Sequence, residues 1–325
     1  MIDRRRFTAL LGTSLAAEAL PGCARRPPAA PANLTTAPMR FGEAVRAIRE
    51  TIARDRADPA IRPEALPRLY EHGAPVPHAV LLYHGFTNCP QQFDELARAY
   101  HARGCNVYVP RIPRHGLEDR LTRDLANLTI PELTTFAEKT FELARGLGTA
   151  TSAVGLSLGG TLVLWLAQTQ PLDLAVPIAP FLMPVPNVQF IGHPAIRLLH
   201  AVPNMYFWWD VRVKQNCKPD YAYPGYSTHA LAELVFFGDE IARDARSTKP
   251  SARDCVLVLN EHDNAVDNRV TRALMTVWAR RGARYRELVL TGLGGPRHDV
   301  IDPTTFPQGR TLVYPTLERI VLGPP

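Results

Sequence analysis

Apolar and polar positions follow two alternating patterns along most of the chain. Short apolar runs, typical of buried strands, are followed by stretches with an apolar residue every three or four positions, typical of amphipathic helices. The predicted strands are 79–83, 106–109, 151–154, 174–178, 255–259 and 284–290. The predicted helices are 41–54, 91–103, 130–147, 158–169 and 268–281, with Thr129 as the N-cap of the third. This alternation predicts an α/β fold with a mostly parallel, doubly wound sheet.

The alternation stops after residue 178 and resumes at residue 255. Residues 181–250 between these points are dense in proline and aromatic residues. A second domain is one interpretation, but about 70 residues is small for an independent core. We therefore predict one domain over 41–325, with a cap insertion at about 181–250 that covers the C-terminal edge of the sheet. Ligands of open α/β sheets bind at that edge.

The first 23 residues resemble an export signal of the twin-arginine type. Arginines precede Phe7, a modestly apolar stretch follows over 8–20, and the segment ends in Leu-Pro-Gly-Cys23. This ending looks like a lipobox, in which Cys23 is acylated. An ordinary amphipathic helix or a signal cleaved elsewhere are the alternatives. Residues 24–40, rich in proline and alanine, are predicted to be a tether. The expected location is the periplasm or cell envelope, with membrane anchoring through Cys23.

Net charge, hydropathy and cysteine spacing exclude several classes of function. The formal net charge is +6, and the basic residues, nearly all arginine, are scattered. A scattered pattern indicates a solvated surface and no nucleic-acid partner. No run approaches the ~18 apolar residues that span a membrane. The remaining cysteines have no zinc-site spacing and are interpreted as structural: Cys89, Cys105, Cys217 and Cys255.

The stretch Gly-Leu-Ser157-Leu-Gly159 carries the strongest chemical signal. It joins a predicted strand to a predicted helix, which places Ser157 at the apex of a sharp turn with its hydroxyl exposed to a substrate. Glycines flank the serine because side chains there would collide with the neighbouring strand or helix. The N–H groups at the start of the helix point toward the space beside the serine, where an oxyanion would form. We predict that Ser157 is a nucleophile.

A serine hydroxyl needs a base to accept its proton, and the base needs an orienting acid. His298 and Asp263 lie downstream, on loops that follow the last two predicted strands. We predict that His298 is the base and Asp263 its partner. Asp267 is the nearest rival of Asp263, but it opens the next helix, where a carboxylate has a capping role.

The oxyanion needs two backbone N–H donors, which we assign to Leu158 and Phe86. Phe86 follows the first strong strand within His84-Gly85-Phe86. His84 precedes the serine in the chain and is interpreted as a support for this loop. His115 and His262 are likewise interpreted as structural supports and not as catalysts. The chemistry of this constellation needs no metal and no organic cofactor.

These motifs together resemble the bacterial carboxylesterases and monoacylglycerol lipases of the α/β-hydrolase superfamily. The resemblance covers roughly residues 78–322 and is weakest in the cap. It rests on the segments 84–87, 110–116, 124–129, 155–159, 263–266 and the loop around His298. It implies an α/β-hydrolase fold and hydrolysis of a small-molecule or lipid ester through Ser157, His298 and Asp263. Two positions depart from the family: Arg114 stands where glycine is common, and Leu133 where an aromatic is usual.

Two alternatives stay open. A thioesterase, acyltransferase, amidase or perhydrolase uses the same acyl-enzyme, and hydrolysis of ester, thioester and amide forms of one acyl group would separate these reactions. A non-catalytic surface lipoprotein is the other alternative, and the intact set of Ser157, Asp263 and His298 argues against it. Haloalkane-type chemistry is disfavoured because it needs a carboxylate where Ser157 stands.

Overall fold

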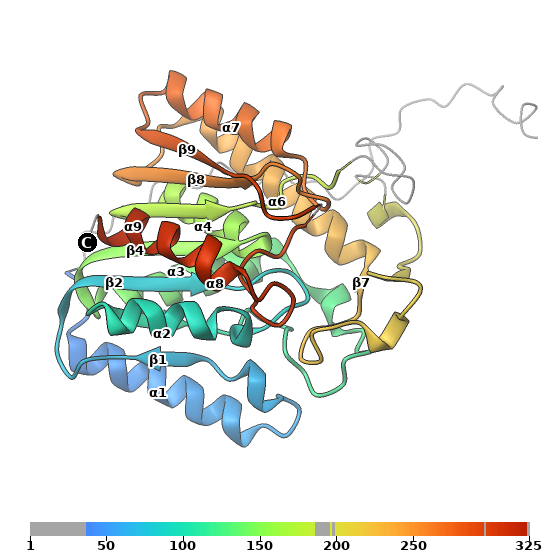
Figure 1. Ribbon diagram of the computed structural model, residues 1–325, viewed down its shortest axis with the longest axis horizontal. Helices are drawn as coiled ribbons and strands as arrows, with labels where there is room; N and C mark the ends of the chain where they lie inside the picture. Colours follow the sequence, from blue (N-terminus) through green and yellow to red (C-terminus); the bar gives the residue numbers. More distant parts are fainter. Residues whose placement is uncertain (1–36, 186–195, 197–198, 296, 324–325) are drawn as a thin grey trace, which may run out of the picture.

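Seven strands form the central sheet, in the order β1-β3-β2-β4-β5-β8-β9 (Figure 1). The computed structural model describes residues 37–185, 196, 199–295 and 297–323. The predicted signal at 1–23, with Cys23, and most of the predicted tether lie outside these residues. The strands are β1 (Arg68–Tyr70), β2 (Val76–Tyr83), β3 (Asn106–Val109), β4 (Gly148–Leu156), β5 (Leu174–Ile178), β8 (Asp254–Asn260) and β9 (Tyr285–Leu290). Neighbouring strands pair in parallel, except that β1 runs antiparallel to β3. The predicted mostly parallel sheet is confirmed.

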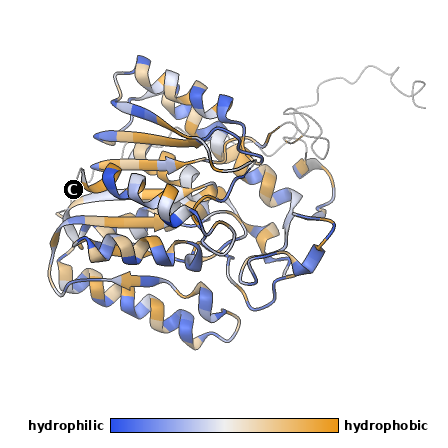
Figure 2. Ribbon diagram, viewed as in Figure 1, coloured by the Kyte–Doolittle hydropathy of each residue, from blue (hydrophilic) through white to orange (hydrophobic). Residues whose placement is uncertain are grey.

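The central strands are apolar on both faces because helices cover both faces. Residues 79–83 of β2 are fully buried, and all of β3 is buried. Figure 2 shows the same central strands as mainly hydrophobic ribbons. Parallel strands buried on two sides read as continuous apolar runs, which is why the sequence marks these strands so clearly.

The helices form two layers. The helices α1 (Phe41–Ala57), α3 (Ile130–Arg145), α4 (Leu158–Thr169), α6 (Thr228–Ser247) and α7 (Asn268–Arg280) contact one another in that order. In Figure 1, α2 (Asp94–Ala102) and α9 (Tyr314–Leu322) lie in front of the sheet, where they contact each other. Every residue of α4 is buried, so the helix that follows Ser157 is enclosed by the sheet and by its neighbouring helices.

Two of the helices begin with the N-cap side chains that the sequence predicts. Thr129 accepts a hydrogen bond from the N–H of Glu132, which confirms its predicted N-cap role. Asp267 caps α7 by accepting from the N–H of Arg269, which confirms its capping explanation. The predicted helix at 91–103 is instead a 3-10 turn over Pro90–Phe93 followed by α2.

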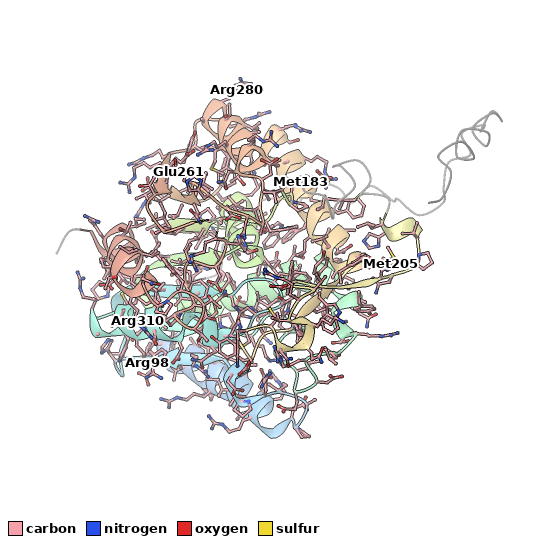
Figure 3. All side chains as sticks on the ribbon, turned by 45° about the vertical axis from the view of Figure 1, so that its right-hand side comes forward. Arg98, Met183, Met205, Glu261, Arg280 and Arg310 are labelled. Atoms are coloured by element: carbon pink, nitrogen blue, oxygen red, sulfur yellow. The ribbon has the colours of Figure 1, made fainter. Side chains whose placement is uncertain are left out.

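The chain between β5 and β8 has an outer and an inner part. The outer part contains a two-stranded hairpin of β6 (Tyr206–Trp208) and β7 (Gly225–Ser227), which lies beyond the C-terminal ends of β2 and β4 (Figure 1). The inner part is α6, which packs against α4 and α7 and so belongs to the helical layer. Figure 3 shows Met183 near the sheet and Met205 on the outer hairpin side, and they are 4% and 45% exposed. The domain boundaries, including the cap at 181–250, stay a prediction.

The C-terminal helices are joined to α2 by ion pairs at the surface. Arg310, on α8 (Gly309–Leu312), contacts Glu95 of α2, and Glu318 of α9 contacts Arg103, the C-cap of α2, at 3.1 Å. Arg98 pairs with Asp94 within α2; Arg310 and Arg98 are labelled in Figure 3. Such exposed pairs contribute little to the free energy of unfolding. None of the described helices has the length and apolar character needed to cross a membrane.

The four described cysteines are free thiols. Cys89, Cys105 and Cys255 are buried, and Cys217 is half-buried. Burial raises the pKa of the Cys255 thiol to about 12, so this thiol stays protonated and behaves as a small apolar side chain.

Candidate active site

Ser157 occupies the sharp turn between β4 and α4. Its backbone has φ 58° and ψ −117°, a region that non-glycine residues rarely adopt and that costs about 1–3 kcal/mol. Three backbone hydrogen bonds hold this conformation: Ser157 N–H donates to the Ile178 carbonyl at 3.0 Å, and the Ser157 carbonyl accepts from Thr161 at 2.9 Å and Phe181 at 3.1 Å. The strained turn is thereby fixed to the end of β5.

The glycines around Ser157 allow backbone segments to touch. A Cβ atom on Gly155 would overlap the Gly159 carbonyl, and one on Gly159 would overlap the carbonyl of Tyr83 at the end of β2. A Cβ on Gly160 would lie 2.9 Å from the Cα of Pro180. The predicted steric need for glycine therefore has a physical basis in close approaches between β2, β4, α4 and the segment after β5.

Asp263 and His298 form a hydrogen-bonded pair. His298 Nδ1 lies 2.9 Å and 3.1 Å from the two carboxylate oxygens of Asp263. The Asp263 side chain is fully buried, and its Oδ1 also accepts from the N–H groups of Ala265 and Val266 at 2.8 and 3.0 Å. These two donors fix the carboxylate. When Nδ1–H donates to Asp263, the other ring nitrogen, Nε2, has a free lone pair and can accept a proton.

The charge of the carboxylates changes the basicity of His298. Burial lowers the pKa of His298, but the charge of Asp263, its hydrogen bond and the charge of Asp299 outweigh burial and raise the pKa above its ordinary value. A higher pKa makes the imidazole a stronger base.

Ser157 and His298 line one cavity of about 370 Å³. That volume lies in the range of small-molecule sites. Within the described residues, no hydrogen bond joins the Ser157 hydroxyl to the His298 ring. Such bonds are often long without substrate and shorten in the complex. Most of the lining is apolar and includes Phe86, Leu156, Phe181, Val185, Trp209 and Tyr226.

The loop after β2 brings the Phe86 N–H to the same cavity. Phe86 lines the cavity, and its N–H and that of Leu158 donate to no other group in the part of the chain that the structure describes. Leu158 is the first residue of α4, where the N–H has no partner within the helix. Both groups are therefore available to a ligand, as expected for the predicted oxyanion donors.

His84 supports this loop. Its Nε2 accepts from the Ile112 N–H at 3.1 Å, so the proton is on Nδ1, which donates to the Gly85 carbonyl at 3.0 Å. The same peptide group carries the Phe86 N–H, so this hydrogen bond also orients that donor. Burial holds the pKa of His84 well below its ordinary value, which keeps the ring neutral. The predicted supporting role of His84 agrees with this geometry.

The outer hairpin segment is joined to the same loop at Thr87. Trp209 Nε1 donates to the Thr87 hydroxyl at 2.9 Å, and the Tyr223 N–H donates to the Thr87 carbonyl at 2.8 Å. Thr87 has a positive φ of 66°, so these bonds stabilise an unfavourable backbone conformation. Sequence reasoning missed both contacts, because residues 209 and 223 carried only a general aromatic signal.

His115, His262 and Arg114 lie outside the reacting centre. Burial lowers the pKa of His115 to about 4, and its Nδ1 contacts the Pro113 carbonyl at 2.8 Å. His262 is exposed. Arg114 has a positive φ of 65°, a conformation that glycine adopts more readily, in accord with the glycine that the resemblance implies for this position. Its guanidinium binds Asp124 and Glu132, each at 2.8 Å, and it does not line the cavity.

Sequence reasoning also missed Gln92 and Asp299. Both line the cavity, and Gln92 Nε2 donates to Asp299 Oδ2 at 2.7 Å. They come from loops that no local pattern relates. Among the described residues, no group of three or more His, Cys, Asp or Glu side chains is arranged to hold a metal ion.

Comparisons with known proteins give one consistent family. The model of the alpha/beta hydrolase family matches residues 79–308. A thermostable monoacylglycerol lipase from Bacillus sp. (strain H-257) is 34% identical over 102 residues, which is 31% of this chain. The aligned part spans only 39% of that curated relative.

Solved structures share the fold. A metagenome-derived lipolytic enzyme superposes with a TM-score of 0.61 at 20% identity, over 80% of this chain and 98% of its own. The monoglyceride lipase of Saccharomyces cerevisiae gives 0.57 at 15% identity, over 79% and 90%. The monoacylglycerol lipase of Paleococcus ferrophilus gives 0.55 at 17% identity, over 78% and 99%. At these identities the similarity shows a shared architecture.

Proposed function

Since this chain belongs to the alpha/beta hydrolase family, we propose that it hydrolyses carboxylic esters with Ser157 as nucleophile, His298 as base and Asp263 as orienting acid. One observation carries the proposal. Ser157 stands on a strained turn and shares a mainly apolar cavity with His298, whose Nδ1 is bound to the buried Asp263 at 2.9 Å. A hydroxyl, a base and two free N–H donors around one cavity are the parts that acyl transfer requires.

The proposed reaction has two steps. The Ser157 hydroxyl attacks the ester carbonyl carbon while His298 Nε2 takes its proton. The N–H groups of Phe86 and Leu158 bind the oxyanion of the tetrahedral intermediate, and His298 then gives the proton to the departing alcohol. In the second step His298 takes a proton from water, the hydroxide attacks the acyl-enzyme, and the proton returns to Ser157 as the acid leaves. Asp263 stabilises the imidazolium in both steps.

The proposed substrate class is an ester with an apolar acyl or alcohol part. Aromatic and aliphatic side chains form much of the cavity, which favours burial of hydrocarbon. The curated relative is a monoacylglycerol lipase, and its 34% identity over the aligned segment supports a lipid ester as one member of this class. A small-molecule carboxylic ester is the other member.

A fluorophosphonate probe tests the proposal directly. The probe reacts with serine hydroxyls that a neighbouring base activates. We expect stoichiometric labelling of the purified protein, with the modified peptide containing Ser157 in mass spectrometry. A folded protein that stays unlabelled would contradict the esterase proposal and favour the non-catalytic lipoprotein.

We further propose that the chain is exported and anchored through acylated Cys23. The twin-arginine-like segment and the lipobox-like ending support this, and both lie outside the described residues. We expect the full chain to fractionate with membranes and to carry a lipid on Cys23 when it is expressed in a bacterium that has twin-arginine export and lipoprotein acylation. Cys23→Ser should move the protein to the soluble fraction. Membrane association that is the same in both forms would contradict the proposed anchor.

A further inference from the structure

Gln92 connects two loops of the cavity with one side chain. Its Oε1 accepts from the Gly85 N–H at 2.7 Å, and its Nε2 donates to Asp299 Oδ2 at 2.7 Å. Gln92 is 2% exposed, so neither hydrogen bond competes with bulk water. Gly85 precedes the proposed oxyanion donor Phe86, and Asp299 follows the proposed base His298. The amide therefore joins the loop of the donor to the loop of the base.

Asp299 is fully engaged at both carboxylate oxygens. Oδ2 accepts from Gln92, and Oδ1 accepts from the N–H groups of Ile301 and Asp302, each at 3.0 Å. These bonds fix the turn that begins directly after His298. Loss of the Gln92 amide would leave the buried Gly85 N–H and one oxygen of the half-buried Asp299 without protein partners, and a buried N–H without a partner is costly.

We infer that Gln92 and Asp299 are positioning residues, which hold His298 and the Phe86 N–H at a fixed separation, and that Asp299 places a second negative charge beside His298. This inference rests on the proposed function. It assigns both residues a role through other groups, since neither is needed to touch the reacting atoms.

The charged groups around His298 give the sign of the expected pH effect. Asp263 faces the ring from the loop after β8, and Asp299 lies next to it in the chain; both favour the imidazolium, against burial. Lys218 lines the same cavity from the outer segment, where it pairs with Asp220. Asp302 lies in the turn that Asp299 holds, and burial and the charge of Asp299 raise its pKa to about 6, so its own titration is recorded beside that of His298. His298 must be neutral to act as a base. Removing the charge of Asp299 lowers the pKa of His298, so activity persists to lower pH.

A charge exchange separates this role from general structural support. Asp299→Asn keeps the shape but turns an amide NH₂ toward Gln92 Nε2, so two donors face each other. Gln92→Glu alone sets two carboxylates face to face. The double variant restores the bridge, because the new carboxylate at position 92 accepts from both the Gly85 N–H and the new amide at position 299. A purely steric role would not produce this reciprocal rescue.

The test is the rate at which a fluorophosphonate labels Ser157 in the purified full chain, measured from about pH 5 to about pH 9, across the range where histidine titrates. The plateau rate is the constant labelling rate at high pH, and the acidic limb is the fall of this rate toward low pH. We expect Asp299→Asn and Gln92→Glu each to lower the plateau rate roughly tenfold. We expect the double variant to come within roughly threefold of the wild-type rate. We expect Asp299→Asn to move the acidic limb to lower pH by about half a unit. Plateau losses that multiply in the double variant, or a limb that does not move, would overturn the inference.

Two further variants keep the test decisive. Gln92→Met removes both hydrogen bonds but leaves the charge of Asp299, so we expect a slower plateau with an unmoved acidic limb; this variant also serves if the double variant does not fold. Gln168→Leu is the matched control. Gln168 is a buried glutamine that bridges Trp278 at 2.8 Å and Thr248 at 2.9 Å, away from the cavity. It should lower Tm without changing either the plateau or the limb.

The outcomes distinguish the inference from the proposed function. A folded wild-type protein without labelling at Ser157 overturns both. If the wild type is labelled at Ser157, and Asp299→Asn and Gln92→Met give the same plateau rate and the same acidic limb as the wild type, the inference is overturned. The proposed function then still stands.

Discussion

Ser157→Ala is expected to lower kcat/KM for a short-chain p-nitrophenyl ester by about 10⁵-fold. Removing a nucleophile that works together with a base costs nearly as much as removing the whole triad. What remains would come from substrate binding and the N–H groups of Phe86 and Leu158. Ser157 lines the cavity, and the residue as a whole is 6% exposed. Removing its hydroxyl oxygen therefore leaves only a small gap. The protein should therefore fold normally, which circular dichroism can verify.

Ser152→Ala is the matched control for this experiment. Ser152 lies on the same strand, β4, is also buried, and does not line the cavity. Its replacement should change kcat/KM by less than roughly twofold, as is usual away from a reacting centre. If Ser157→Ala retained activity within tenfold of the wild type, another residue would be the nucleophile and the proposed mechanism would be wrong.

Gly159→Ala is expected to have the largest effect on stability. Its Cβ would overlap the backbone carbonyl of Tyr83, which cannot move without displacing β2. We expect the free energy of unfolding to fall by about 3 kcal/mol, the upper range of overpacking in a core. Tm should fall by about 5 °C in a chain of this size. Activity should fall as well, because α4 begins directly after Ser157.

Gly42→Ala distinguishes this clash from a general effect of glycine replacement. Gly42 is exposed near the start of α1, and a Cβ there has no atom within 4 Å. Since alanine favours helix more than glycine does, this variant should be as stable as the wild type or slightly more stable. Equal unfolding midpoints for Gly159→Ala and the wild type would show that β2 and α4 are not in direct contact.

Local patterns predicted much of the parallel sheet. The predicted helix at 158–169 and strand at 174–178 have the bounds of α4 and β5, because glycine, proline and a long apolar run mark their ends. The edge strand β1 was missed. It has only three half-buried residues and pairs antiparallel to β3, so it lacks the apolar run of a buried strand. The helix α6 was not predicted; it lies within residues 181–250, for which only a cap insertion was predicted, and periodicity does not show what a segment packs against.

The candidate site was only partly visible in the sequence. Ser157, Asp263 and His298 follow strand ends, which gives each a local signal. The contact of Gln92 with Asp299 joins residues 207 positions apart, and that of Trp209 with Thr87 spans 122. Neither pair has a pattern that periodicity or spacing can relate. Such contacts depend on how the loops fold over the sheet edge.

The close approach of β2 and α4 determines which parts of the cavity tolerate substitution. Backbone against backbone sets the place of Ser157, whereas side chains from the segment between β5 and β8 form part of the cavity wall. Mutation can therefore vary that wall while Ser157, the proposed nucleophile, keeps its position. Trp209 and Tyr223 are exceptions, because they also hold Thr87. For the proposed activity, substitutions in the segment between β5 and β8 are therefore expected to change substrate preference more than they change the reactivity of Ser157.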